Sequence, residues 1–293
     1  MTMIIFILTI VNNYGGVLLM KVFDISKYKE MSPKDVRQAI RDGEITFPTA
    51  GMCQGYAQAN LVILPPEYAE DFKKFAEANP FPCPILEIIE GTPETHSMAE
   101  GGNIVTDIPE YFIYENGVHT KTVKDAAEYW KEGYVGFLIG CSFSFEEALM
   151  KAGIEIRHIA TGRNVPMYKT NIQTVKVGAF EGPTVCSMRP MTPENAKLAY
   201  DITVKFPNVH GAPVHIGDPK EIGIEDISKP DYGDSVEIYE GEVPVFWPCG
   251  VTPQAAIENA KPPIVITHSP GHMFITDIKN DILNDYLESK KNK

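Results

Sequence analysis

The chain has 293 residues, with 26 lysines and arginines against 39 aspartates and glutamates, and a formal net charge of −13. This length can bury a large core, and the share of apolar residues (44%) and of charged residues (22%) is that of a soluble globular protein rather than a disordered one. The acidic balance argues against a nucleic-acid partner, because binding to phosphates needs clustered cations.

The first twenty residues differ from the rest, since none of them is charged. Their apolar run, residues 4–11, is far shorter than the roughly 20 residues that a membrane span needs. A basic segment typical of a signal peptide is also missing. Residues 1–20 are therefore predicted to be an extension, such as an added strand, or a mis-called start before Met20 or Met31.

The next stretch predicts regular elements with clear ends. Ser32 has the side chain of an N-cap, Pro33 suits a first helical turn, and residues 42–43 end that helix. Three further elements follow: a strand over residues 61–64, a helix ending near residue 79 with Tyr68, Phe72 and Phe75 turned inward, and a strand over residues 85–89.

Three segments repeat one pattern, in which an apolar strand leads through a cysteine and a loop into a helix. They are FLIGCSFSFEEALMKAG, TVCSMRPMTPENAKLAYDI and VFWPCGVTPQAAIENA. Their helix starts are predicted at a Ser144–Glu147 capping box, at Thr192-Pro193 and at Thr252-Pro253. A further buried strand is predicted within residues 262–268.

Alternating strands and helices predict an α/β fold with a mostly parallel sheet and flanking helices. Residues 102–120 and 157–185 are expected to be antiparallel and to belong to a smaller α+β lobe. Residues 21–293 are thus predicted to form one catalytic unit of two intimately packed lobes.

The five cysteines are widely spaced, and no two form a Cys-x-x-Cys pair. This favours free thiols in a reducing cytoplasm over disulfides or a zinc site. Cys141 stands where a nucleophile would stand, between a strand and a helix. However, Cys186 and Cys249 fill the same slot in the other two segments, so a packing role is favoured for all three.

Two of the five arginines, Arg163 and Arg189, lie in loops with few charges, TGRNVPMYKTN and CSMRPMTP. The planar guanidinium of arginine matches a carboxylate in a bidentate manner. Both are therefore candidate anchors for a substrate carboxylate. The alternative is that each pairs with one of the many acids of the chain.

Histidines gather in two segments, HGAPVHIGDP and ITHSPGH. Four histidines with Asp218 would suffice for a zinc or iron site, but their spacing matches no helix-borne metal motif. Acid/base work by one histidine is favoured, and hydrogen bonding to turns remains the structural alternative. The preferred base is His215, with Asp218 orienting it and His210 at the entrance to the loop.

Seven runs together resemble the D-glutamate cyclase family, and the resemblance covers roughly residues 32–280. The runs are GYAQANLVILP, FLIGCSFSFEEAL, NVPMYKTNI, SMRPM, HGAPVHIGDPKEIGI, GEVPVFWPCGVTPQ and ITHSPGH. The resemblance implies a hydro-lyase that converts D-glutamate to 5-oxo-D-proline and water, on a two-lobed α/β fold. His272 is not expected in this family, which weakens the four-histidine metal site.

Cyclisation requires a base for the amine, stabilisation of an oxyanion and an anchor for the α-carboxylate. The predicted catalytic residues are His215, Asp218, Ser142 and His210, with Ser142 and the backbone at residues 250–251 near the oxyanion. The predicted substrate-binding residues are Arg189, Arg163, Asn164, Tyr168, Gly250, Thr252 and His268.

This chemistry requires no cofactor and no metal, and its expected partner is a small acidic substrate, without nucleic acid or membrane. The oligomeric state stays open, a homodimer included. Two other functions also stay open: a non-catalytic protein that binds an amino acid or a dicarboxylate, and a metal-dependent lyase acting on a hydroxy acid.

Overall fold

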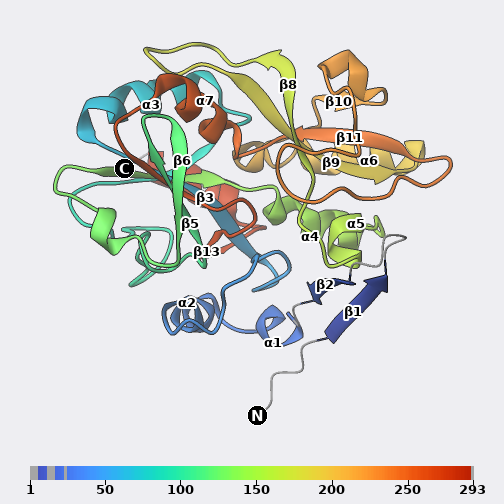
Figure 1. Ribbon diagram of the computed structural model, residues 1–293, viewed down its shortest axis with the longest axis horizontal. Coiled ribbons are helices and arrows are strands. Elements are labelled where there is room, and N and C mark those ends of the chain that lie inside the picture. Colours follow the sequence, from blue (N-terminus) through green and yellow to red (C-terminus); the bar gives the residue numbers. More distant parts are fainter. Residues whose placement is uncertain (1–5, 12–16, 23–24, 292–293) are drawn as a thin grey trace.

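The computed structural model describes residues 6–11, 17–22 and 25–291, and Figure 1 shows the arrangement of its elements. Within the predicted extension, β1 (Phe6–Val11) pairs with β2 (Val17–Val22) as an antiparallel hairpin. Residues 1–5 and 12–16 lie outside the described residues. That residues 1–20 are an extension or a mis-called start therefore stays a prediction.

The larger sheet has seven strands and is built around β3, which is buried over nearly its whole length. One edge of β3 pairs with β7, and the other pairs with β12 and β13 in succession. In spatial order the strands are β4 (Ile85–Ile89), β7 (Val135–Gly140), β3 (Tyr56–Leu64), β12 (Val265–His268), β5 (Tyr111–Glu115) and β6 (Val118–Val123), with β13 (Phe274–Lys279) beside β3.

The smaller sheet has four strands, in the order β10 (His215–Ile216), β11 (Val243–Pro248), β9 (Pro183–Met191) and β8 (Met167–Gln173). Short 3₁₀ turns lie at Ala127–Tyr129, Pro207–Val209 and Pro219–Ile222. The helices are α1 (Ser26–Lys29), α2 (Pro33–Arg41), α3 (Pro66–Ala78), α4 (Phe143–Lys151), α5 (Arg157–Ala160), α6 (Pro193–Thr203), α7 (Thr252–Ala260) and α8 (Leu283–Lys291).

The predicted mostly parallel sheet is wrong, because every strand pair in the described part of the chain is antiparallel. Parallel pairing needs a helix that returns the chain to the same sheet in the same direction. Here α4 leads from β7 towards β8 of the smaller sheet, and α7 leads from β11 to β12 of the larger one. After α6 the chain runs through residues 204–242 before β11, which then lies antiparallel to β9.

The two segments expected to be antiparallel contribute to different sheets. Strands β5 and β6 pair within the larger sheet, whereas β8 pairs with β9 in the smaller one. The boundaries of the two predicted lobes stay a prediction.

The helix starts follow the sequence where a side chain caps them. Ser32 accepts a hydrogen bond from the backbone N–H of Asp35, and Thr192 accepts one from Asn195, so both predicted caps are confirmed. The capping box at Ser144 is wrong: α4 begins one residue earlier, and the Ser144 hydroxyl accepts a hydrogen bond from the backbone N–H of Gln58 instead.

The third predicted cap, at Thr252, is also wrong as a cap. Helix α7 begins at Thr252 itself, with Pro253 in its first turn as expected. The Thr252 hydroxyl bonds to the backbone of Val185 on β9 rather than to its own helix. The hydroxyl therefore makes a tertiary hydrogen bond in place of the helix cap that the local sequence predicts.

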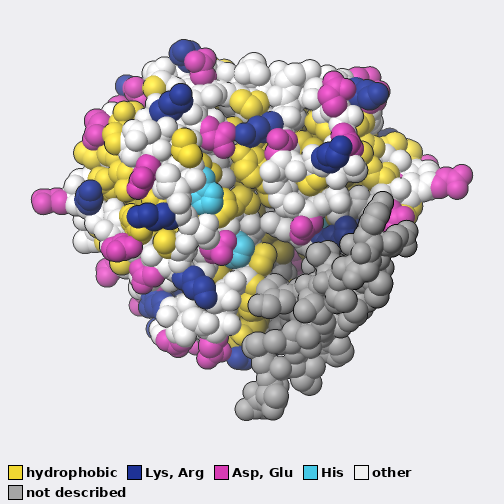
Figure 2. Space-filling view, in the orientation of Figure 1, with side chains coloured by type: hydrophobic (Ala, Val, Ile, Leu, Met, Phe, Trp, Pro, Cys, Tyr) yellow, Lys and Arg dark blue, Asp and Glu magenta, His cyan; other side chains and the backbone are white. Residues whose placement is uncertain are grey.

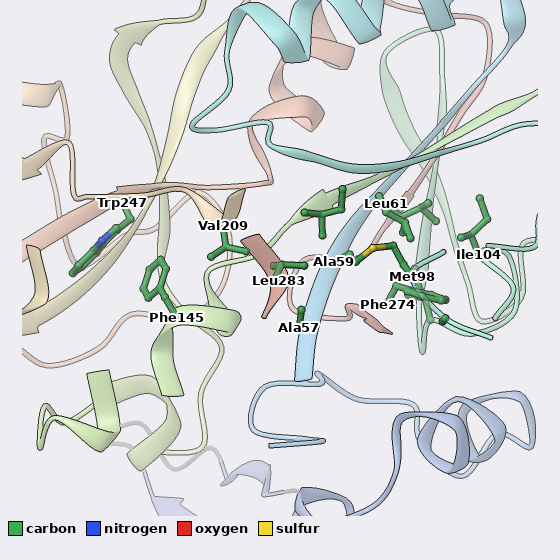
Figure 3. Packing of buried hydrophobic residues seen from close by; sticks show 14 of the residues in the cluster. Ala57, Ala59, Leu61, Met98, Ile104, Phe145, Val209, Trp247, Phe274 and Leu283 are labelled. Atoms are coloured by element: carbon green, nitrogen blue, oxygen red, sulfur yellow. The ribbon is translucent and has the colours of Figure 1, made fainter. Parts of the chain in front are cut away.

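The largest apolar cluster joins the two sheets through α4. Among the residues labelled in Figure 3, Phe145 of α4 and Trp247 of β11 lie at one end and Ile104 lies at the other, with Leu61 of β3 between them. Burying each such side chain contributes about 1.5–3 kcal/mol. The cluster therefore holds α4 firmly between the sheets, and with it the residue after Phe145, Glu146.

The surface carries charges of both signs. Figure 2 shows lysine, arginine, aspartate and glutamate side chains interspersed over one face of the molecule. In the part of the chain that the structure describes, no helix combines the length and apolar character needed to cross a membrane.

Candidate functional site

A cavity of about 720 Å³ opens between α1, the loop before β3 and helix α4. The polar side chains of its lining include Lys29, Gln58, Glu146, Glu147, Lys151 and Asn280. Cations therefore stand beside acids and amides around one space. A cavity of this size is ample for a small amino acid.

The part of the lining contributed by Glu146 is a buried carboxylate in a dense polar network. Arg189 donates to Glu146 Oε1 from Nε at 3.0 Å and also from Nη2. The same guanidinium donates to the hydroxyls of Ser187 and Ser142, each at 3.0 Å. His158 places Nε2 at 3.3 Å from Glu146 Oε1. All five side chains are almost completely buried.

Strand alternation explains why these groups meet, since successive side chains of a strand point to opposite faces. Ser187 and Arg189 are two residues apart on β9, and Trp247 lies opposite Ser187 on β11, so the three share the face towards α4. The Arg189 guanidinium carbon lies 5.3 Å from the Phe145 ring centre and 5.4 Å from that of Trp247. Two aromatic rings thus enclose the charge.

The Glu146 carboxylate stays ionised because its partners outweigh its burial. Burial raises the pKa of this carboxyl, but the charge of Arg189, the neighbouring His158 and the hydrogen bonds from Arg189 lower it by more, so its pKa lies below the ordinary value. The cavity therefore presents a fixed negative charge, which favours a positively charged group of a ligand.

Of the predicted site residues, the structure brings Ser142 and Arg189 together. However, the guanidinium of Arg189 already bonds to Glu146, Ser142 and Ser187. The alternative considered for this arginine, pairing with an acid of the chain, is thus its role in the fold. Its role as an anchor for substrate stays a prediction.

The predicted base His215 lies away from this network. His215 is opposite Phe246 on β11, and Arg189 is opposite the preceding residue, Val245, so the two side chains are on different faces of the smaller sheet. His215 Nε2 donates to the backbone oxygen of Asp218 at 2.8 Å, while the Asp218 carboxylate accepts from the backbone N–H of Lys220. The catalytic roles of His215 and Asp218 stay predictions.

His210 and His268 are buried imidazoles that each use one ring nitrogen. His210 Nδ1 donates to the carbonyl of Phe81 at 2.7 Å, and His268 Nδ1 accepts from the backbone N–H of Leu61 at 3.1 Å. Neither Nε2 has a partner in the described part of the chain. Burial lowers the pKa of each histidine from 6.5 to about 4, so both are neutral at pH 7.

We expect these two histidines to make the protein acid-labile between pH 6.5 and pH 4. The unfolded chain takes up a proton on each of them near pH 6.5, whereas the folded chain does so only near pH 4, so stability falls as pH falls through this window. A pKa lowered from 6.5 to about 4 corresponds to about 3 kcal/mol per histidine. Urea unfolding from pH 7 to pH 4.5 measures the slope.

The variant His210→Gln should flatten that slope by about 1 kcal/mol per pH unit. His96→Gln is the matched control, because His96 is exposed. A slope that His210→Gln and His268→Gln both leave unchanged would contradict the assignment.

The other predicted binding residues bond to the chain itself and do not line the cavity. Their partners are as follows: Arg163 donates to the Ser235 carbonyl, Asn164 to the Pro270 carbonyl at 3.1 Å, and Tyr168 to the Ile227 carbonyl at 2.6 Å, while Gly250 packs against the Asn60 amide and Thr252 accepts from Val185 at 3.0 Å. Their binding roles stay predictions.

The candidate metal ligands do not gather. Within the described residues, no group of three or more histidine, cysteine, aspartate or glutamate side chains is placed to hold a metal ion. Cys141, Cys186 and Cys249 are buried, and burial raises the pKa of all three thiols, that of Cys249 to about 11. The packing interpretation of the three cysteines agrees with this burial.

Two residues of the network, Glu146 and His158, had no place in the sequence-based site. The signal for Glu146 was its position in the first turn after an apolar strand, in FSFEEAL, where only Glu147 was considered as a cap. His158 lies in IRHIA, which shows no motif. Both residues are recognised as part of the site only because the structure places them in one buried network with Arg189.

The sequence is similar to a known family model and to named bacterial proteins. Residues 135–277 match the family model described as D-glutamate cyclase. A protein of Thermoanaerobacter sp. (strain X514) named "Putative hydro-lyase" is 56% identical over 257 residues, which cover 87% of this chain and 97% of the relative. "Putative hydro-lyase YcsI" of Bacillus subtilis (strain 168) is 56% identical, covering 86% of this chain and 99% of the relative.

Proposed function

Because the chain belongs to the D-glutamate cyclase family, we propose that it is a hydro-lyase that cyclises D-glutamate to 5-oxo-D-proline and water. The observation that carries the proposal is the ionised Glu146 carboxylate that lines a cavity whose rim bears Lys29 and Lys151. An ammonium group and two carboxylates on one small molecule match this distribution of charge.

The reaction joins the amine nitrogen to the γ-carboxyl carbon and breaks one carbon–oxygen bond. The ammonium loses two protons, and the departing oxygen takes up two protons to leave as water, so the charge of the substrate is unchanged. The protein has to hold the amine close to the γ-carboxyl and move these protons.

In this proposal Glu146 binds the substrate ammonium and accepts its first proton. His158 Nε2 lies 3.3 Å from the carboxylate oxygen of Glu146 and helps to hold that carboxylate in place. Arg189 keeps Glu146 ionised and oriented through its two donors. Arg189 and His158 are therefore positioning residues, while Glu146 contacts the substrate.

The rim lysines are proposed to hold the two carboxylates. Lys151 is largely exposed and pairs with Glu147 at 2.7 Å, and Lys29 is exposed on α1. Lys29→Met and Lys151→Met should each raise the KM for D-glutamate about twofold to fivefold, because an exposed ion pair contributes at most about 1 kcal/mol. Steady-state kinetics at two salt concentrations measures this, since salt screens exposed charges.

Lys74→Met serves as the control, because Lys74 is an exposed lysine of α3 that does not line the cavity. A KM that responds equally to Lys74→Met and to the rim variants would place the carboxylates elsewhere.

The experiment that tests the function is incubation of the protein with D-glutamate and, separately, with L-glutamate. Product is followed by chiral chromatography of 5-oxoproline against a protein-free control. Formation of 5-oxo-D-proline supports the proposal. Binding of glutamate without product would instead support the amino-acid-binding alternative, and turnover of hydroxy acids only with added divalent metal would support the metal-dependent lyase.

A further inference from the structure

A second buried arginine, Arg157, holds the short helix α5. Its side chain is almost completely buried. It donates to Glu242 from Nη2 at 2.7 Å and from Nη1 at 3.3 Å, one bond to each carboxylate oxygen. Nη1 also donates to the Glu237 carbonyl at 2.8 Å, and Nε donates to the Glu155 carboxylate at 2.5 Å. The guanidinium carbon lies 3.8 Å from the ring centre of Tyr239. These contacts join α5 to the segment just before β11.

Helix α5 depends on such contacts because it is a single turn. It has four residues, Arg157–Ala160, and its N-cap is Ile156, whose side chain has no oxygen to cap the helix. One turn of helix is unstable by itself, since fixing its backbone costs more free energy than its first hydrogen bond contributes. Tertiary contacts therefore decide where α5 lies.

The next two residues of α5 belong to the candidate site. His158 places Nε2 at 3.3 Å from Glu146 Oε1, and its ring centre lies 6.3 Å from that of Phe143. Ile159 lines the cavity, as do Glu146 and Phe143. His158 and Arg189 are the two residues that lower the pKa of the Glu146 carboxyl. A displacement of α5 would therefore change the surroundings of that carboxylate and one wall of the cavity.

The segment that bonds to Arg157 is the end of a long irregular loop. This loop, residues 223–242, connects the 3₁₀ turn at Pro219–Ile222 to β11. Its middle is fixed to the start of β8, since Tyr232 and Met167 exchange two backbone hydrogen bonds. The bidentate pair with Glu242 then fixes its end to α5. The loop is therefore a firm support for α5 rather than a loose connection.

We infer that the Arg157–Glu242 pair holds His158 beside the carboxylate of the candidate site, so that both members of the pair are positioning residues. Through this pair the loop of residues 223–242 sets the geometry of a cavity that none of its residues lines. Neither member contacts the substrate. The inference rests on the proposed function only for the role of Glu146 in the reaction.

The test is a double-mutant cycle on kcat for D-glutamate. Arg157→Met removes the bidentate pair and should lower kcat about tenfold, because a misplacement of about 1 Å in a site can cost about 100-fold in rate. In a His158→Asn background the same change should lower kcat less than about twofold, since the group that Arg157 positions is already absent. Losses that multiply in the double variant would mean that Arg157 does not act through His158, and would overturn the inference.

Two further variants change the same contact. Glu242→Gln weakens it from the side of the loop and should also lower kcat. Arg157→Lys keeps the charge but not the fork of donors, so it should recover part of the loss seen in Arg157→Met. Lys229→Met is the matched control, because Lys229 is an exposed cation of the same loop that pairs with Asp226 at 2.8 Å. An equal fall in kcat in Lys229→Met would overturn the specific role of the Arg157–Glu242 pair.

A second measurement does not depend on turnover. Isotope labelling of the glutamate carboxyl carbons, with Glu146→Gln to assign the resonance, gives the pKa of the Glu146 carboxyl by NMR titration of the free protein. Arg157→Met should raise this pKa, because His158, one of the groups that lower it, is displaced. Lys229→Met should leave it unchanged. If Arg157→Met does not fold, Arg157→Lys takes its place in both measurements.

The two measurements separate the inference from the proposed function. If the wild type forms no product from D-glutamate, the catalytic proposal fails, and the titration decides the inference: a raised pKa of Glu146 in Arg157→Met supports it, and an unchanged pKa overturns it. If the wild type is active and Arg157→Met keeps its full kcat, the inference alone is overturned.

Discussion

Arg189→Met should lower the free energy of unfolding by about 3–5 kcal/mol, the cost of leaving one member of a buried ion pair without its partner. Glu146 would remain buried after losing the hydrogen bonds from Arg189. The ring of His158, with Nε2 at 3.3 Å, would still lie beside its carboxylate. The hydroxyls of Ser142 and Ser187 would also lose their donor. Urea unfolding at pH 7 measures the change.

The double variant Glu146→Gln/Arg189→Met should recover a large part of that loss, because it removes both charges and places an apolar side chain between the Phe145 and Trp247 rings. Arg163→Met is the matched control. Arg163 is exposed and bonds to a backbone carbonyl, so a change within about 0.5 kcal/mol is expected. Equal losses in Arg163→Met and Arg189→Met would show that the buried pair is not specially important.

Glu146→Gln should lower turnover of D-glutamate at least about 100-fold, the loss expected when a group that accepts a proton in the reaction is removed. Glutamine keeps the shape of the side chain but provides neither the charge that binds the ammonium nor a basic oxygen. Rates under saturating substrate measure this, together with a check of folding by circular dichroism.

The double variant Glu146→Gln/Arg189→Met controls for stability, since it should fold well and remain inactive. His215→Asn tests the competing site on the other face of the smaller sheet. If Glu146 performs the chemistry, His215→Asn keeps most of its activity. If His215→Asn were inactive and Glu146→Gln active, the catalytic site would instead lie at the loop of residues 210–219.

Local chemistry made several elements predictable from the sequence. A hydroxyl followed by proline correctly marked the helix starts at Ser32 and Thr192, because the hydrogen bond that caps the helix spans only three residues. At Thr252 the same pattern failed, since its hydroxyl bonds to β9 instead. The buried strands at residues 61–64 and 85–89 followed from short apolar runs. The resemblance to the D-glutamate cyclase family likewise came from the residues alone and agrees with the relatives.

The site was predictable only in part, since sequence position does not say which face of a strand a side chain will occupy. Arg189 was recognised as unusual, but its partner Glu146 is 43 residues away and lies on a different element. His215 was favoured because histidine titrates near neutral pH, a property of the residue type rather than of its place. The pairing of His215 with Phe246 then puts it on the other face from Arg189.

What the sequence by itself determined, then, are two helix starts, at Ser32 and Thr192, the buried strands and the family, all of which depend on neighbouring residues or on motifs. Only the tertiary structure decided the direction of strand pairing and the union of Glu146, His158 and Arg189 beside a cavity. The physical reason is range. A cap or an apolar run acts over a few residues. Strands β9 and β11, in contrast, are separated in the chain by residues 192–242, and their pairing depends on how side chains of both sheets are buried against α4.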